Sequence, residues 1–116
     1  MEFTQMLTQN HEFRRLYSKG ASVVTPFMVV YCRHRGSGTN RLGITVSAKI
    51  GNAVTRNKIR RRLKEIYRLS ESRLRPGFDI VVVARFAAVE APYKKLESTF
   101  FYAAKKLSLL RSEDSL

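Results

Sequence analysis

A dense run of basic residues is the feature of this chain with the clearest chemistry. Six of the nine residues from Arg56 to Lys64 are Lys or Arg, and apolar residues recur between them at helical spacing. Arg outnumbers Lys in this run, and a guanidinium group can donate two parallel hydrogen bonds to one phosphate. A cationic face fixed to a packed helix predicts binding to an array of phosphates, so the expected partner is a nucleic acid.

Three aromatic residues form a second candidate group. Phe13 and Tyr17 are four residues apart and share one face of a predicted helix, whereas Tyr31 lies on a predicted strand. From periodicity alone, burial of Phe13 and Tyr17 against a sheet is the favoured interpretation. Tyr31 shares a strand face with Phe27 and Val29, where it either lines a groove or packs.

Side chains for protein-based catalysis are sparse. His11 and His34 are far apart in the sequence and have no ligand-spaced Cys or acid beside them, so a metal site held by the protein is not expected. Glu65 lies within the basic run, and Asp79 begins a strand, where we expect it to cap or to pair with an arginine. No paired carboxylates, Ser-His-Asp or Cys-His arrangement can be assembled, so the sequence predicts no catalytic residues.

The composition agrees with one basic globular domain. The chain has 116 residues, 44% of them hydrophobic, and a formal net charge of +13. Because like charges repel in the folded state, a polyanionic partner is the expected reason for so high a charge. Cys32 cannot form an internal disulfide and is expected to pack as a small hydrophobe. No secretory signal and no run of about 20 apolar residues occurs, so we expect a soluble, cytoplasmic protein.

Three helices are expected to position these groups. The first covers residues 10–19, with Asn10 as its N-cap and Gly20 as its end. Asn52 caps a long helix that runs to about residue 70. Pro92 opens the last helix, because proline is tolerated at the first helical position. That helix carries a periodic apolar stripe formed by Tyr93, Leu96, Phe100, Ala103 or Ala104, Leu107 and Leu110.

The strand signals lie between these helices. Residues 22–24 lead to Pro26, which favours a sheet edge or a break. Residues 27–33 and 41–47 read as two strands that form a hairpin across the turn at residues 36–40. The segment FDIVVVAR is almost continuously apolar, which is typical of a central strand buried on both faces. The order of these elements predicts one α/β layer sandwich.

The long helix has two predicted faces. Four apolar residues fall within about one third of its circumference at ~100° per residue and should face the sheet: Ile59, Leu63, Ile66 and Tyr67. The adjoining arc carries Arg56, Asn57, Arg60, Arg61, Lys64 and Arg68, whereas Lys58 and Arg62 lie further round, toward solvent. Only Glu65 offsets the repulsion between these charges, so the apolar stripe must hold the helix. A solvated face normally mixes both signs, and this one barely does.

The segment from residue 49 to 61, KIGNAVTRNKIRR, resembles the signature of the protein subunit of bacterial ribonuclease P. In that family, a Lys-x-x-Gly-x-Ala loop precedes an Arg-Asn-x-x-(Lys/Arg)-Arg helix. The similarity extends over most of the chain. It includes Phe13 and Tyr17 before Gly20, an Arg-Leu-Gly strand ending in Val46 and Ser47, and the run Gly-Phe-Asp-Ile-Val-Val from Gly77.

The resemblance implies a specific fold and reaction. The fold is α+β, a two-layer α/β sandwich in the order α-β-β-β-α-β-α with a four-stranded mixed sheet and a left-handed βαβ crossover, against the general rule. A catalytic RNA subunit cleaves precursor tRNA to make the mature 5′ end, and one protein per RNA assists. The chemistry belongs to RNA and to Mg²⁺ bound mainly through RNA and substrate, with no organic cofactor. Residues 1–116 form one RNA-binding domain whose end, about 111–116, is expected to be frayed.

The resemblance also assigns residues to two surfaces. The RNA subunit would be bound by Arg56, Asn57, Lys58, Arg60, Arg61, Lys64 and Arg68. A cleft between the sheet and the first helix would bind the single-stranded 5′ leader of precursor tRNA through Phe13, Tyr17, Tyr31, Ser47 and Lys49. A ring can close a core and still offer a face to an unpaired base, and such stacking contributes about 1–3 kcal/mol with any base.

Two other classes of function are compatible with a basic helix. One is a ribosomal or chaperone-type RNA-binding protein without a role in cleavage. The other is a DNA-binding regulator that places the helix in a major groove. The second is the weaker alternative, because no short helix and tight turn precede the basic helix and nothing indicates a dimer with spaced half-sites.

Overall fold

The computed structural model describes residues 4–36 and 38–111. Its strands are β1 (Thr4–Met6), β2 (Ala21–Val24), β3 (Met28–His34), β4 (Asn40–Thr45) and β5 (Phe78–Ala84), and its helices are α1 (Asn10–Lys19), α2 (Ala53–Ser70) and α3 (Tyr93–Lys106). Three short 3₁₀ helices join them: η1 (Ala48–Ile50), η2 (Glu71–Arg73) and η3 (Phe86–Val89). The predicted α+β class is confirmed.

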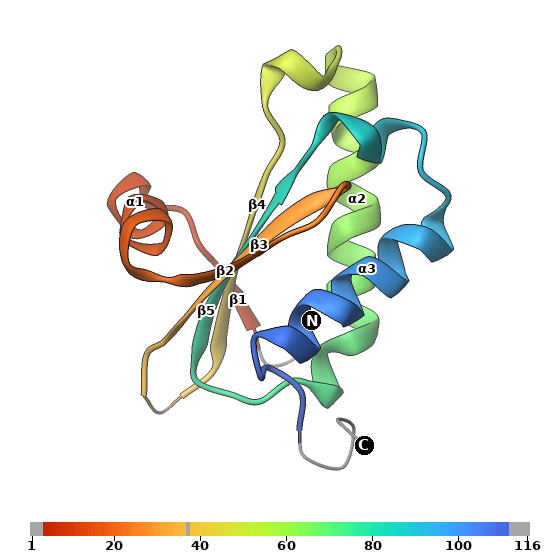
Figure 1. Ribbon diagram of the computed structural model, residues 1–116. Coiled ribbons are helices and arrows are strands. Elements are labelled where there is room, and N and C mark those ends of the chain that lie inside the picture. The colour runs from red at the N-terminus through yellow and green to blue at the C-terminus, as the bar shows by residue number, and fades with distance from the viewer. Residues whose placement is uncertain (1–3, 37, 112–116) are drawn as a thin grey trace.

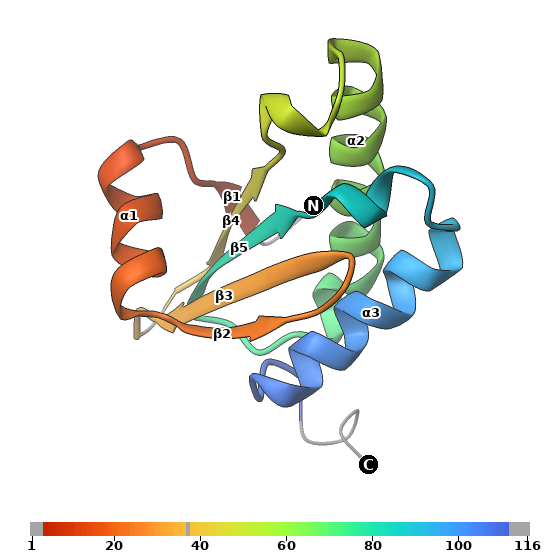
Figure 2. The ribbon, with the colours of Figure 1, turned by 45° about the horizontal axis from the view of Figure 1, so that its top comes forward.

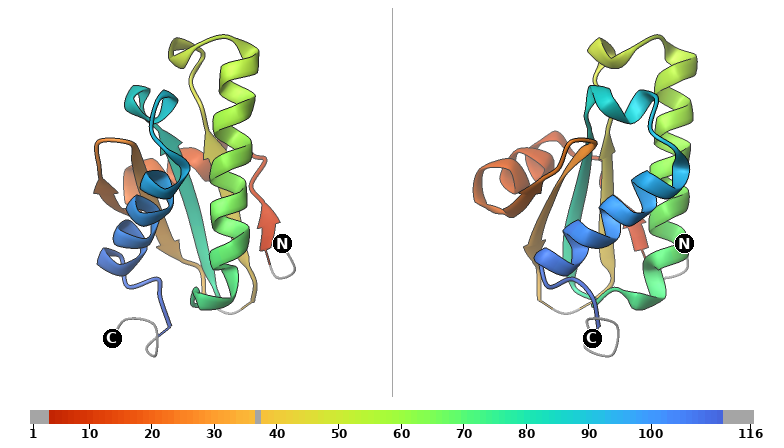
Figure 3. Two further views of the ribbon diagram at one scale, coloured as in Figure 1. Left: turned by 90° about the vertical axis from the view of Figure 1, so that its right-hand side faces the viewer. Right: turned by 45° about the vertical axis from the view of Figure 1, so that its right-hand side comes forward.

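The sheet is mixed and has the strand order β1-β4-β5-β3-β2. α2 and α3 lie side by side on one face, and α1 lies on the other (Figures 1 and 3). The larger core is thus the expected sandwich of a sheet against two helices, and α1 adds a smaller layer. β4, α2 and β5 form a βαβ unit with adjacent parallel strands. The left-handed course of this crossover stays a prediction.

The predicted hairpin between residues 27–33 and 41–47 is wrong. β5 lies between β3 and β4, antiparallel to the first and parallel to the second, and β3 instead forms a hairpin with β2. The apolar run of β5 suits this central position, because α1 covers one face of the sheet and α2 and α3 cover the other. β2 is an edge strand, as the approach to Pro26 predicted.

The sheet has five strands rather than the predicted four. The additional strand, β1, pairs in parallel with β4, so that Thr4 lies opposite Asn40 and Met6 opposite Leu42. Three residues are too few for an alternating pattern to be recognised in the sequence. β1 places Leu7, which is buried, at the start of the turn into α1.

The larger core forms between the sheet and the pair α2 and α3. It contains the inward side chains of β3, namely Met28, Val30 and Cys32, and burial raises the pKa of the Cys32 thiol. A smaller cluster of Leu7, Leu16 and Val81 lies under α1. The apolar stripe of α3 is confirmed by Leu96, Phe100, Ala103 and Ala104, all buried, although the helix ends at Lys106.

The helix ends follow the sequence signals in part. Asn52 caps α2, because its Oδ1 accepts a hydrogen bond from the backbone N–H of Thr55 at 2.9 Å. Asn10 is not the cap of α1: Gln9 occupies that position without a side-chain hydrogen bond. Pro92 is the N-cap of α3 rather than its first helical residue.

At the C-terminal end of the described residues, Arg111 is hydrogen-bonded to η2. Its backbone N–H donates to the carbonyl of Arg73 at 2.9 Å, and its Nε donates to the carbonyl of Ser72 at 2.9 Å. The rest of the predicted frayed tail, residues 112–116, lies outside the described residues. Within residues 4–36 and 38–111, no helix combines the length and the apolar character needed to cross a membrane.

Candidate nucleic-acid interface

The helix α2 is anchored by the predicted apolar stripe. Ile59, Leu63, Ile66 and Tyr67 are 2%, 4%, 1% and 0% exposed. The Tyr67 hydroxyl lies 2.8 Å from Thr4 Oγ1, and its ring meets that of Phe100 edge to face at 6.3 Å between centroids. Because burial of four large side chains fixes the rotation of α2, its opposite face is held outward as one rigid surface.

That outward face carries most of the predicted basic residues. Asn57, Lys58, Arg61, Lys64 and Arg68 are exposed, whereas Arg56 and Arg60 are half-buried. The Arg60 guanidinium donates to Asn57 Oδ1 at 3.0 Å, so these two side chains are already ordered together. Arg62, expected toward solvent, is half-buried instead.

Arg56 has one polar atom that is fully buried. Its Nε is buried and has no hydrogen-bond partner among the described residues. A buried guanidinium N–H without a partner carries a desolvation cost.

One basic side chain of α2 is neutralised by the protein itself. Arg68 donates two hydrogen bonds to the Glu65 carboxylate, with N–O distances of 3.0 and 2.6 Å, and these lower the pKa of Glu65. The pair is exposed to solvent, so it contributes little to stability and can be exchanged for a phosphate. Glu65 is the only acid of α2, so the remaining basic residues keep their charge uncompensated along this helix.

A second surface lies between α1 and the sheet. Tyr17 is 40% exposed, its hydroxyl lies 3.1 Å from Thr45 Oγ1, and its ring meets that of Tyr31 edge to face at 5.0 Å between centroids. Beside these rings is a groove of about 470 Å³ lined by Asn10, Phe13, Arg14, Tyr17 and Thr45. This groove is called the α1 groove below. Its rings and its single arginine suit an unpaired base and its phosphate.

Gly43 allows Phe13 to form the floor of the α1 groove. A Cβ atom at Gly43 would lie only 2.5 Å from Cε1 of the Phe13 ring. Gly43 and Tyr31 both lie opposite Val81 of the central strand, so these residues form one row across the sheet. The ring of Phe13 therefore packs directly on the sheet backbone, and α1 stays close enough for Tyr17 to reach Tyr31.

An ion-pair cluster at the next row fixes α1 to the sheet. Arg41 Nε and Nη2 donate to the two oxygens of Asp79 at 2.8 and 2.7 Å, and Arg41 Nη1 pairs with the Glu12 carboxylate of α1. Arg35 Nε lies 3.0 Å from Asp79 Oδ1. The hydrogen bond to Asp79 raises the pKa of Arg41 above its ordinary value. The expectation that Asp79 pairs with an arginine is confirmed.

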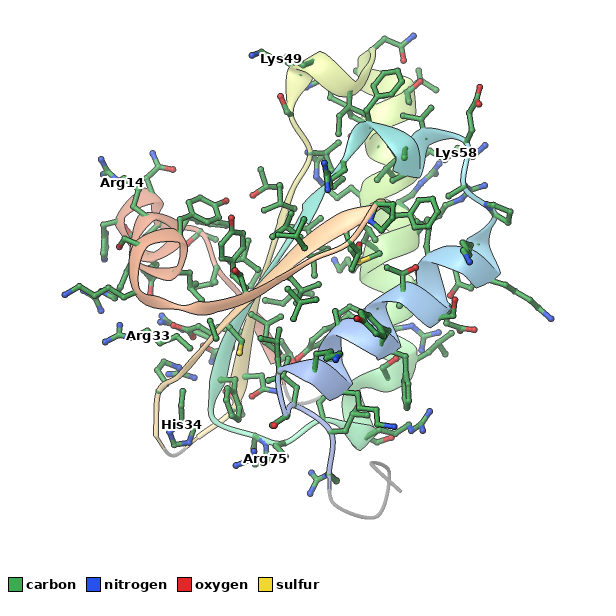
Figure 4. All side chains as sticks on the ribbon, viewed as in Figure 1. Arg14, Arg33, His34, Lys49, Lys58 and Arg75 are labelled. Atoms are coloured by element: carbon green, nitrogen blue, oxygen red, sulfur yellow. The ribbon has the colours of Figure 1, made fainter. Side chains whose placement is uncertain are left out.

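The predicted leader-binding residues do not all meet in the α1 groove. The structure brings Phe13, Tyr17 and Tyr31 together, but Ser47 and Lys49 lie beyond the end of β4, in the segment that leads into α2. There Ser47 Oγ accepts a hydrogen bond from the Lys49 backbone N–H at 3.2 Å. Figure 4 shows Lys49 well apart from Arg14 of α1. This segment instead connects the α1 groove to the basic face of α2.

Three groove residues escaped the sequence reasoning: Asn10, Arg14 and Thr45. Arg14 follows Phe13 directly and had the simplest available signal, a cation beside an aromatic residue on a predicted helix. Thr45 could not be found, because its role depends on the sheet register that sets it beside Tyr17. Among residues 4–36 and 38–111, no three His, Cys, Asp or Glu side chains gather as metal ligands.

The chain is similar to proteins of one known family. A model of the family Ribonuclease P matches residues 1–108. The chain is 38% identical over 112 residues to the ribonuclease P protein component of Alkaliphilus oremlandii, covering 97% of this chain and 98% of that protein. It is 42% identical over 93 residues to that of a Thermoanaerobacter species, covering 80% of each.

Two solved structures are also similar. The RNase P protein of Staphylococcus aureus is 34% identical with a TM-score of 0.83, over 91% of this chain and 97% of that chain. The RNase P protein of Thermotoga maritima is 29% identical with a TM-score of 0.77, over 84% and 93% of the two chains.

Proposed function

This chain belongs to the ribonuclease P protein family, and from that premise we propose that it promotes removal of the 5′ leader from precursor tRNA. In this proposal the chain is one RNA-binding domain that joins a catalytic RNA subunit, one protein per RNA. The basic face of α2 binds the RNA subunit, and the α1 groove binds the single-stranded leader. The product is tRNA with a mature 5′ end.

One observation carries the proposal. α2 presents a cationic face with one acid along its whole length, while four buried side chains fix its rotation. Neutralising adjacent phosphates on a preformed surface avoids the entropic cost of ordering long basic side chains one by one. Asn57 and Arg60 are already hydrogen-bonded to each other, which supports such preorganisation.

The α1 groove suits a ligand of variable sequence. Aromatic stacking provides affinity without reading base identity, and leaders differ among precursors. Arg14 supplies a cation at the groove, and Lys49 supplies another on the segment between the groove and α2. A leader that leaves the groove toward Lys49 would reach the side of the protein where the RNA subunit is bound.

Among residues 4–36 and 38–111, no three His, Cys, Asp or Glu side chains gather where a resident magnesium ion could be held. Mg²⁺ requires oxygen ligands in octahedral geometry, and the one carboxylate on α2, that of Glu65, is paired with Arg68. In this proposal the metal that the reaction uses is held by the RNA and its substrate. The protein would contribute by lowering phosphate repulsion and by holding the leader.

Site-specific crosslinking tests the two assigned surfaces together. A photoreactive residue at Tyr17 should crosslink to the leader of bound precursor tRNA, and one at Arg61 should crosslink to the RNA subunit. Glu97, exposed on α3 and the only acid of that helix, is the control position and should give neither product. If Tyr17 crosslinks to the RNA subunit and Arg61 to the leader, the assignment of the two surfaces is wrong.

A further inference from the structure

A groove at the opposite edge of the sheet is not used by the proposed function. It has a volume of about 420 Å³ and lies between the β2–β3 turn and α3, lined among others by Val24, Pro26, Phe27, Lys95, Thr99 and Tyr102. Figure 2 shows the β2–β3 hairpin alongside α3. This volume falls within the range of about 300–1,000 Å³ typical of small-ligand sites. It is called the α3 groove below.

The turn that forms one wall of the α3 groove is rigid. Thr25 is buried and closes the turn on Met28 through its backbone N–H at 2.9 Å and its hydroxyl at 2.6 Å. Arg85 holds the turn from outside, because its guanidinium donates to the Thr25 carbonyl and its backbone N–H donates to the Phe27 carbonyl, at 2.8 and 3.0 Å. The groove is therefore preformed.

The other wall is a stripe on α3 that does not belong to the core. Lys95, Thr99, Tyr102 and Lys106 are spaced by four, three and four residues, so they share one side of the helix. Tyr102 is 53% exposed, and the ammonium group of Lys106 lies 5.7 Å from the centroid of its ring. Lys106 thus lies over one face of the exposed ring, and Lys95 lies two helical turns before it on the same side of α3.

The charge of this wall selects the kind of ligand. α3 carries four lysines and a single acid, Glu97, and Glu97 lines a different hollow together with Leu69 and Phe101. An aromatic platform with cations along the same side of the helix matches a nucleotide, which offers a base for stacking and phosphates for the ammonium groups. We propose that the α3 groove is a second RNA-binding site, which takes an unpaired nucleotide with its base on Tyr102 and its phosphates at Lys95 and Lys106.

The α3 groove and the basic face of α2 belong to helices that pack over different strands of the sheet. α2 packs over β4, whereas α3 packs over β3 and β2, so the two RNA-binding surfaces lie over opposite halves of the sheet. A protein with both surfaces can bridge two RNA segments at once. The inference rests on the proposed function for the identity of the RNA, but binding at the groove can be measured independently.

A single fluorophore can report on the α3 groove, because the chain contains no tryptophan. In Tyr102→Trp, single-stranded oligouridylate should quench the indole emission by stacking on it. The matched control is Leu69→Trp, since Leu69 is also 53% exposed but lines the hollow that contains Glu97. Adding Lys95→Gln and Lys106→Gln to Tyr102→Trp should raise the half-quenching concentration roughly ten-fold, because two phosphate contacts are lost.

Three outcomes would overturn the inference: no quenching in Tyr102→Trp, equal quenching in Leu69→Trp, or stronger quenching by an acidic peptide than by RNA. The last would point to a protein strand added at β2, the exposed sheet edge. The proposed function is judged separately, by precursor tRNA cleavage with the same variants. If RNA quenches the indole but the protein does not support cleavage, only the proposed function is contradicted. If the protein supports cleavage but RNA does not quench the indole, only the α3 site is contradicted.

Discussion

Arg41 of β4 and Asp79 of β5 lie directly opposite each other in the sheet and share two hydrogen bonds, at 2.8 and 2.7 Å. The third arm of the same guanidinium pairs with Glu12 of α1. One side chain therefore connects two parallel strands to the helix that forms a wall of the α1 groove. The distance between α1 and the sheet, and with it the width of the groove, depends on this connection.

Glu12→Gln tests the connection because it removes the charge of the α1 partner and leaves the Arg41–Asp79 pair intact. We expect the free energy of unfolding to fall by about 1 kcal/mol, because a neutral acceptor that can still form the hydrogen bond replaces a charged one. Binding of leader-bearing precursor tRNA should weaken more than binding of mature tRNA. Glu97→Gln on α3 is the control for loss of one acid. If the two tRNAs lose affinity equally, Glu12 does not position the groove.

Tyr17→Ala should weaken the leader contact directly. The change removes a half-exposed ring from the α1 groove, and base–aromatic stacking of about 1–3 kcal/mol corresponds to a loss of about five-fold or more in affinity for precursor tRNA. Mature tRNA should bind as before, and Tyr17→Phe, which keeps the ring but not the hydroxyl contact to Thr45, should retain most of the affinity.

The double variant Phe13→Ala with Tyr17→Ala should enlarge this effect, at a cost in stability, because Phe13 packs on Gly43. Equilibrium unfolding separates that cost from binding. Equal losses for precursor and mature tRNA, or simple unfolding of the double variant, would favour a purely structural role for both rings.

Arg60→Glu with Arg61→Glu should abolish tight assembly with the RNA subunit. The change reverses two charges on the basic face of α2, where Arg61 is exposed and Arg60 is ordered by Asn57. Lys94→Glu with Lys105→Glu makes the same change in net charge on exposed positions of α3 that lie outside the α3 groove. Filter binding of labelled RNA subunit should therefore show a large loss for the first variant and a small loss for the second. Similar losses would mean that net charge, rather than this face, drives assembly.

The salt dependence of RNA-subunit binding should be steep. If about six phosphates are neutralised, the logarithm of the association constant should fall against the logarithm of salt concentration with a slope of about −4 to −5. The slope for the double variant of Arg60 and Arg61 should be shallower by the amount that about two phosphate contacts contribute. A flat response in the wild-type protein would contradict the electrostatic account of the basic face.

The sequence predicted those parts of the fold that depend on local patterns. The buried stripe of α2 follows from the spacing of Ile59, Leu63, Ile66 and Tyr67, and its start follows from the side chain of Asn52. The basic face could be identified for the same reason, since a helix with one face buried must present the other. The outward positions of Asn57, Arg61 and Lys64 needed no tertiary information.

The sequence could not predict features that depend on pairing between distant segments. The turn at residues 36–40 favoured a hairpin, but β5, almost forty residues later, separates β3 from β4. The link from Glu12 to Arg41 also joins separate elements, and no local pattern marks it. For the same reason Ser47 and Lys49, which are close in sequence to Thr45, could not be separated from the α1 groove before the end of β4 was known.

The central claim is that this protein enables RNA-catalysed cleavage by holding both RNA partners, and reconstitution with the isolated RNA subunit tests it most directly. At a magnesium concentration too low for the RNA subunit alone, wild-type protein should restore accurate removal of the 5′ leader. Arg60→Glu with Arg61→Glu should fail to do so, and Lys94→Glu with Lys105→Glu should restore cleavage almost fully. If wild-type protein binds RNA but leaves the cleavage rate unchanged, the account is contradicted, and a general RNA-binding role takes its place.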